Sequence, residues 1–188
     1  MASKHLMIAI NWYGPYETLE EAQVEARDWY AHGLYLAIGK RKFERRAKMQ
    51  YIGIGEALHR RLHDGHHKLG EITRDRVFWL GEIATAEPSG RRVKVTRASL
   101  DYAEWLHVRF LGLPLNDKKT KSLPKRGVTV LNRWFETNFK TAHKRAGHLD
   151  WPDLIDFPDP VDELPARTVW FRSRRKEKFE PSDYAKAG

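Results

Sequence analysis

Two tyrosines stand on neighbouring segments that the sequence predicts to be β-strands. Gly33–Ile38 is the first strand, and Gln50–Ile54 is the second strand of a hairpin with a long loop. Because side chains alternate along a strand, Tyr35 and Tyr51 lie opposite the aliphatic face, beside Ala and Gly positions. Small neighbours leave room for a ligand to approach the two phenol groups. The simpler explanation is that tyrosine is common in strands.

An arginine, Arg61, stands ten residues after the second tyrosine. We expect a helix over Glu56–Gly65, with Leu58 and Leu62 on its apolar face. Arg61 borders that apolar stripe, whereas Arg60 faces solvent. An arginine held at the edge of a core is well placed to bind a phosphate. Alternatively, its aliphatic stem packs while its guanidinium group reaches into water.

A carboxylate occupies the apolar face of a later helix, which is expected over Thr96–Leu111. Glu104 has Leu100 and Val108 one turn away on either side. A carboxylate there is largely desolvated, so it requires a partner. An arginine would make the arrangement structural and a divalent cation would make it functional. The residues alone leave both alternatives open.

Taken together, these segments resemble the GIY-YIG nuclease superfamily. The resemblance covers residues 33–116, which is less than half of the chain. The chain has Leu34 where the first motif has isoleucine, and Gly65 where many members carry a histidine. The matching elements are, in order, Gly33-Leu34-Tyr35, Tyr51-Ile52-Gly53, Arg61, Glu104 and Pro114-Leu115-Asn116.

The resemblance implies an α+β fold, in which a small three-stranded antiparallel sheet of the GIY-YIG type is flanked by helices and carries N- and C-terminal extensions. It also implies a metal-dependent DNA endonuclease that hydrolyses phosphodiester bonds. Because no separate DNA-binding domain is recognisable, a compact restriction-type endonuclease is the first expectation. The alternatives are a repair or mobile-element nuclease of the same superfamily, and a nucleic-acid-binding protein without catalysis.

By this resemblance, the tyrosine hydroxyls and the arginine guanidinium group would act on the attacking water and on the scissile phosphate. Tyr35 would orient or deprotonate the water, which requires nearby positive charge because the pKa of an unperturbed tyrosine is about 10. Arg61 would supply that charge and hold the scissile phosphate. Tyr51 would hydrogen-bond the phosphate or the water.

The remaining implied roles concern the cofactor and its surroundings. Glu104 would be the protein ligand of a single Mg²⁺ or Mn²⁺ ion, with water molecules completing an oxygen shell. Asn116 would fix the backbone near the metal. The histidine of the family would be His66, although His63 stands on the other side of Gly65 and is the alternative.

Two basic segments leave the ends of the elements that carry these motifs. Residues 40–49 form the hairpin loop, and residues 118–126 follow Asn116. Placed there, they would flank the active face and follow the backbone of double-stranded DNA. Solvated loops are the simpler alternative. The candidate DNA-binding residues are Lys40, Arg41, Lys42, Arg45, Arg46, Lys118, Lys119, Lys121, Lys125 and Arg126.

Other elements must position this constellation within one domain. Residues 1–32 are expected to be an N-terminal extension with a helix, residues 33–117 the nuclease core, and residues 118–188 a basic loop and a C-terminal extension packed on the core. The further elements expected are strands over 5–10, 76–84 and 128–131, helices over 19–30 and 134–146, and an irregular Pro-rich segment from Trp151 onward.

Composition narrows the partners of the chain. It has 188 residues and a formal net charge of +9, which favours a polyanionic partner, first nucleic acid and second an anionic membrane. The absence of cysteine excludes disulfides, thiolate zinc sites and cysteine nucleophiles. No apolar run would span a bilayer and no signal peptide is recognisable, so we expect a cytoplasmic protein with no membrane partner. One active site cuts one strand, so a double-strand break would need a homodimer or sequential nicking.

Overall fold

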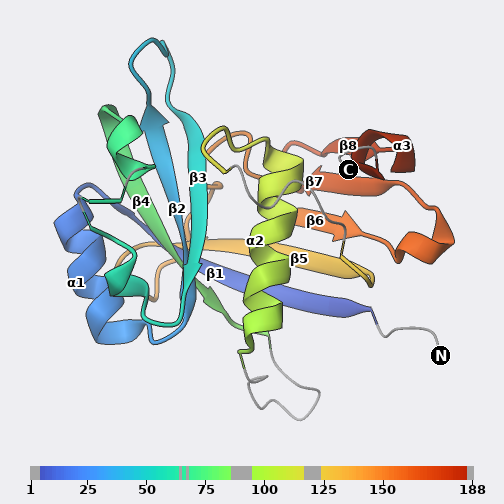
Figure 1. Ribbon diagram of the computed structural model, residues 1–188, viewed down its shortest axis with the longest axis horizontal. Helices are drawn as coiled ribbons and strands as arrows, with labels where there is room; N and C mark the ends of the chain where they lie inside the picture. The colour runs from blue at the N-terminus through green and yellow to red at the C-terminus, as the bar shows by residue number, and fades with distance from the viewer. Residues whose placement is uncertain (1–4, 64, 67, 86–94, 117–123, 186–188) are drawn as a thin grey trace.

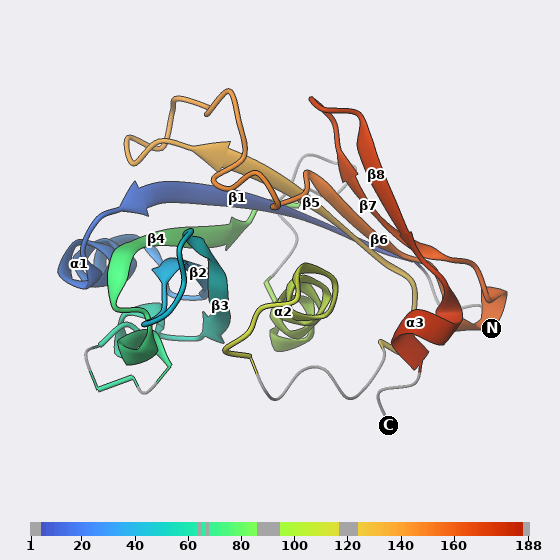
Figure 2. The ribbon, with the colours of Figure 1, turned by 90° about the horizontal axis from the view of Figure 1, so that it is seen from above.

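The chain builds one eight-stranded sheet that curls around a helix (Figures 1 and 2). The computed structural model describes residues 5–63, 65, 66, 68–85, 95–116 and 124–185. The strands are β1 (Leu6–Tyr16), β2 (Gly33–Lys40), β3 (Lys48–Gly55), β4 (Arg74–Ile83), β5 (Val128–Phe135), β6 (Leu154–Phe157), β7 (Ala166–Trp170) and β8 (Arg175–Phe179). The helices are α1 (Leu19–Trp29), α2 (Arg97–Leu111) and α3 (Pro181–Ala185), and the single 3-10 turns are η1 (Leu58–Arg60), η2 (Leu69–Glu71) and η3 (Pro160–Asp162).

The expected α+β fold, with a small three-stranded sheet flanked by helices, is wrong. The strand order is β3-β2-β4-β1-β5-β6-β7-β8, so strands far apart in sequence continue one sheet. Strands β1 and β5 pair in parallel, whereas all other described pairs are antiparallel, and the sheet is therefore mixed. Strand β3 lies at one edge of the sheet, and this edge is where the candidate site forms.

The two faces of the sheet carry separate apolar cores. On β2, Leu34 and Leu36 pack in the core that contains the buried side of α2, as expected for the aliphatic face. Tyr35 and Ala37 lie in the second core together with the buried side of α1. Both side chains are 0% exposed, so the expected open space for a ligand on this face of β2 is wrong.

The two expected long helices are confirmed, with their ends at the capping residues. Helix α1 begins after Thr18, whose hydroxyl accepts a hydrogen bond from the backbone amide of Glu21 while the Glu21 carboxylate caps the Thr18 amide. Helix α2 begins after Thr96 and ends at Gly112, which has a φ of +59°.

Two other expected helices are wrong. The described residues between 56 and 65 contain only the single 3-10 turn η1, where the side chain of Gln23 on α1 donates to the carbonyl of His59 at 3.3 Å. Residues 134–146 are a continuation of β5 followed by a loop. Every second residue here is buried, namely Val130, Asn132 and Trp134, as expected for a strand. This strand pairs with β1.

The expected irregular C-terminal segment is also wrong, because it contains β6, β7 and β8. Pro152 and Pro158 flank β6 and Pro165 precedes β7, so these prolines stand outside the strands rather than within them. In the described part of the chain, no helix is long and apolar enough to cross a membrane.

Candidate active site

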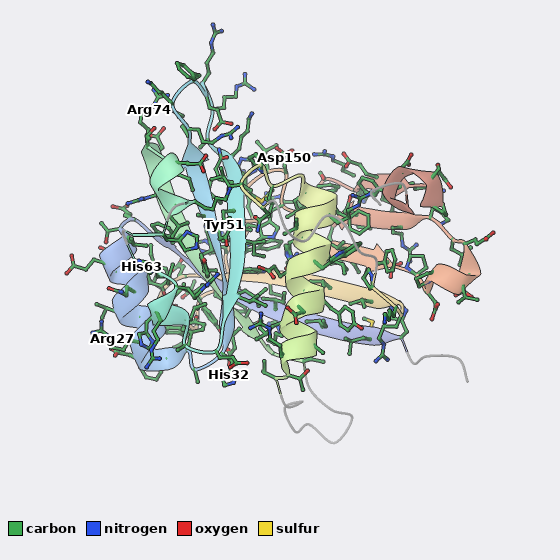
Figure 3. The ribbon with its side chains drawn as sticks, in the orientation of Figure 1. Arg27, His32, Tyr51, His63, Arg74 and Asp150 are labelled. Atoms are coloured by element: carbon green, nitrogen blue, oxygen red, sulfur yellow. The ribbon has the colours of Figure 1, made fainter. Side chains whose placement is uncertain are left out.

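A cleft of about 710 Å³ lies along the outer edge of the sheet, between β3, the segment that follows it, and α2. Because β3 is an edge strand, side chains from both faces of the sheet reach this cleft. Tyr51 comes from β3 and His63 from the segment after it (Figure 3). Five of the six residues expected to act in catalysis line the cleft: Tyr51, Arg61, His66, Glu104 and Asn116.

The sixth residue, Tyr35, lies behind the cleft wall. Its side chain is 0% exposed, and its ring centroid is 5.8 Å from that of Tyr51. Gly53 is the cross-strand neighbour of Tyr35, and a Cβ atom there would lie 2.5 Å from the Tyr35 ring. The glycine of the second motif therefore makes room for the first tyrosine rather than for a ligand.

His66 connects Tyr35 to the cleft. It is 7% exposed, and its Nε2 atom lies 3.2 Å from the Tyr35 hydroxyl oxygen. The backbone amide of Leu69 lies 3.4 Å from Nδ1 of His66, so Nδ1 is an acceptor. In the neutral imidazole, Nε2 then carries the proton and donates to Tyr35. His63, the alternative to His66, also lines the cleft, but it is exposed.

Burial controls the protonation state of Tyr35. It raises the pKa of this phenol well above the ordinary value of 10.0, and Tyr51 raises it further. The positive charge of Arg61 lowers the pKa but does not outweigh burial. Tyr35 therefore keeps its proton at neutral pH in this environment, where its hydroxyl is hydrogen-bonded to His66.

Arg60 and Arg61 were expected on different faces of a helix, and this expectation is wrong. No helix separates them onto different faces, and both side chains are exposed and line the cleft. Arg61 nevertheless packs against the end of β3, because a Cβ on Gly55 would lie 3.2 Å from its Cγ. It is also the one whose charge reaches Tyr35.

Glu104 is a buried carboxylate, as its apolar neighbours indicate. It is 7% exposed, while Leu100 and Val108 are 0% and 2% exposed. Among the described residues, no group of three or more His, Cys, Asp or Glu side chains could hold a metal ion. One carboxylate on the wall of a cleft nevertheless fits Mg²⁺, which usually keeps several waters and binds through one or two carboxylates together with substrate phosphate.

Asn116 fixes the backbone at the edge of the sheet. Its Oδ1 accepts from the amide of Ile52 at 2.9 Å, and its Nδ2 donates to the carbonyl of Ile52 at 2.7 Å. The amide of Leu115 donates to the carbonyl of Gln50. These bonds attach the segment after α2 to β3 and satisfy backbone groups that an edge strand leaves open.

Several cleft residues were not found from the sequence. Arg97 is the clearest case, because it stands seven residues, or about two turns, before Glu104 on the same side of α2. This seven-residue spacing is visible in the sequence and would have placed Arg97 on the same side of the helix as Glu104. Arg97 forms an ion pair with Asp101 at 3.3 Å. Other charged or titratable side chains that line the cleft and were not assigned are Glu56, Arg60 and Lys68.

The expected DNA-binding residues differ in whether they form ion pairs and in how exposed their side chains are. Lys40 forms an ion pair with Asp75, and Arg41 pairs with Glu44 at 3.5 Å. Exposed side chains on the β2–β3 loop are those of Lys42, Arg45 and Arg46. Lys125 is exposed and Arg126 is half-buried, whereas Lys118, Lys119 and Lys121 lie outside the described residues.

Comparisons of the chain with family models, with curated proteins and with solved structures find no match. The case for a function therefore comes from the motif residues and from the cleft that they share.

Proposed function

We propose that the protein is a metal-dependent DNA endonuclease of the kind that the GIY-YIG resemblance implies. The observation that carries the proposal is that Tyr51, Arg61, His66, Glu104 and Asn116, which are spread over 66 positions of the chain, line one cleft. They belong to separate segments before, within and after α2. Hydroxyl, guanidinium, imidazole and carboxylate groups in one cleft are suited to phosphodiester hydrolysis.

The roles follow from which groups reach the cleft. Arg61 binds the scissile phosphate and stabilises the charge that develops on it. Tyr51 is half-buried on the cleft wall, so it is the hydroxyl that contacts the phosphate or the attacking water. Tyr35 acts one layer behind, where it holds His66 and Tyr51. This assignment shifts the water-orienting role from Tyr35 to Tyr51.

Glu104 would hold the divalent cation, with water and a phosphate oxygen as the other ligands. A bound Mg²⁺ would neutralise charge on the phosphoryl oxygens. Asn116 keeps the backbone of β3 in place beside this carboxylate.

A plasmid nicking assay, with Mg²⁺ and with a chelator, tests the proposal. We expect Mg²⁺-dependent cleavage that falls by a factor of about 10² or more in Arg61→Ala. Arg27→Ala is the matched control, because Arg27 is an exposed arginine on α1 that does not line the cleft (Figure 3). Binding without cleavage would favour the rival, a nucleic-acid-binding protein that lacks catalysis.

Within the nucleases, we propose a restriction-type enzyme. Cytoplasmic location and the use of a homodimer for double-strand cuts belong to the same proposal. Sequencing the ends of cleaved plasmid DNA separates the alternatives, because a restriction enzyme leaves one defined sequence at the cut. Cleavage set by branches or lesions rather than by sequence would favour a repair nuclease.

A further inference from the structure

A second basic surface lies on the C-terminal part of the chain, away from the cleft. The loop after β5 supplies Lys144 and Arg145, and the turn between β7 and β8 supplies Arg172 and Arg174. All four side chains are exposed. We call these four residues the C-terminal basic surface. Phe171, at the start of the same turn, is 55% exposed among these cations.

The charges of this surface are uncompensated. Within the described parts of the chain, none of the four residues forms an ion pair. The adjacent Arg175 is different, because it pairs with Asp150 at 3.3 Å and with Glu177. Four unneutralised cations on neighbouring segments create a positive potential that attracts a polyanion.

Hydrogen bonds hold the surface in shape. The Arg172 Nη1 group donates to the carbonyl of Lys144 at 3.0 Å and so joins the loop to the turn. The backbone amide of Phe171 donates to a carboxylate oxygen of Asp153 at 2.7 Å. His143 donates through Nε2 to the carbonyl of Gly14 at 2.8 Å. A surface that is already ordered loses less conformational entropy when it binds.

The surface borders a hollow of about 400 Å³. Lys144 and Arg145 line it together with His143, and Trp79 forms part of its wall. The Trp79 ring is 3% exposed and meets the His143 ring edge-on at 5.3 Å. The hollow therefore has rigid aromatic walls and cationic side chains, an arrangement that accepts a phosphate with its sugar.

The loop that supplies Lys144 and Arg145 lies against the loop between β2 and β3. His148 donates through Nε2 to the carbonyl of Ala47 at 3.2 Å, so the two loops touch. The β2–β3 loop carries the exposed Arg45 and Arg46. In Figure 2 the turn between β7 and β8 stands at the rim of the sheet, on the side away from α2. The cations therefore extend beyond the cleft onto another part of the molecule.

We propose that the C-terminal basic surface binds the sugar-phosphate backbone of double-stranded DNA, outside the cleft. The identity of the polyanion rests on the proposed function. The charge and the hydrogen-bonded geometry come from the surface itself. Its contacts add affinity without reading base sequence, because they are directed at phosphates.

The test is a binding titration of the full chain with a fluorescent duplex at several salt concentrations. The test variant is Lys144→Ala/Arg145→Ala/Arg174→Ala, with Arg172 kept because it holds the loop. The control is Arg27→Ala/Arg133→Ala/Lys178→Ala, which removes the same charge from exposed positions elsewhere. We expect the slope of log K against log salt to flatten by about one unit per lost phosphate contact in the test variant, and by less in the control.

Equal slopes in the wild type and the test variant would overturn the proposal, and so would equal losses in the two triple variants. Vesicles containing phosphatidylserine, bound by the wild type and not by the test variant, would assign the surface to a membrane instead. If the triple variant does not melt cooperatively, Arg145→Gln and Arg174→Gln carry the test singly. Plasmid cleavage is scored separately, so a wild type that binds DNA without cutting it contradicts the proposed function and leaves this inference standing.

Discussion

The two tyrosine hydroxyls of the candidate site differ in what surrounds them. Tyr51 is half-buried on the cleft wall, whereas Tyr35 is 0% exposed and bonded to His66. The first can touch a substrate, and the second can act only through its neighbours. This difference separates a catalytic contact from a positioning one.

Removing each hydroxyl should therefore have a different effect. We expect Tyr51→Phe to lower single-turnover cleavage by a factor of about 10² with little change in stability. Tyr35→Phe removes the hydrogen bond between the Tyr35 hydroxyl and the His66 ring, so it should lower the free energy of unfolding by about 1 kcal/mol. Urea unfolding beside the cleavage assay measures both. Full stability of Tyr35→Phe would contradict the hydrogen-bond assignment.

Gly53 offers a second test at this scale. A Cβ atom at this position would lie 2.5 Å from the ring of Tyr35, which is enclosed and has little space to move. We expect Gly53→Ala to destabilise the fold by about 1–3 kcal/mol through overpacking and to weaken cleavage. Gly70→Ala is the matched control, because no atom lies within 4 Å of a Cβ there. Similar melting temperatures for the two variants would show that Tyr35 moves without cost.

For the helices and strands, the sequence predicted those features that residues close together in the chain determine. The helices expected over 19–30 and Thr96–Leu111 match α1 and α2 to within a residue, because cap residues adjacent in the sequence fix their starts. The alternation through β2 likewise identified its aliphatic face. The resemblance assigned six residues to one site, and Tyr35 is the one among them that does not line the cleft.

The failures occur where distant contacts decide the local structure. Residues 56–65 have a helical apolar spacing, yet their described part contains only one 3-10 turn, in which the carbonyl of His59 accepts from the side chain of Gln23 on α1. The aromatic residues after Asn132 resemble anchors of a helix. They continue a strand instead, because β1 supplies a parallel partner that the local sequence does not reveal.

Helix α2 also carries a pH-sensitive group. His107 is 0% exposed, and burial lowers its pKa from 6.5 to about 4. The carbonyl of Ala103 at 2.7 Å and the Oδ1 of Asn132 at 3.1 Å favour the protonated form and oppose this shift without overcoming it. The unfolded chain therefore takes up a proton first as the pH falls.

The stability of the wild type should accordingly decrease as the pH falls from 6.5 toward about 4, by roughly 3 kcal/mol in total. Urea unfolding at several pH values in this window measures the loss. His107→Gln should remove most of the dependence, whereas His63→Gln, which changes an exposed histidine, should keep it. A wild type that is equally stable throughout the window would contradict a buried neutral His107.

At the scale of the whole molecule, the sheet joins the two ends of the chain to the motif-bearing segment. Strand β1 lies between β4 and β5, so the N-terminal residues occupy the interior of the sheet. Ile155, Phe157 and Ala166 are all 0% exposed and pack in the same core as α2. The helix that carries Glu104 is thus held by strands that follow it in the sequence.

A chain that ends at Pro152 should therefore fail to fold cooperatively, although it retains every motif residue. It would lose β6 to β8 and uncover apolar core residues next to α2. Thermal melting followed by circular dichroism checks this. The control ends at Glu180 and removes only α3, so it should melt near the wild-type temperature. A truncated chain that melts cooperatively would show that the first part of the chain folds alone.

In the proposed function, the cleft at the edge of the sheet hydrolyses DNA with a metal held by Glu104. The most direct measurement compares Glu104→Gln with the wild type in Mg²⁺-dependent plasmid cleavage, beside DNA binding at equal protein concentration. Glu56→Gln is the matched control, because Glu56 also lines the cleft but is exposed. We predict that Glu104→Gln binds DNA and does not cut it, while Glu56→Gln cuts at close to the wild-type rate. A Glu104→Gln protein that still cleaves DNA with Mg²⁺ would contradict the account.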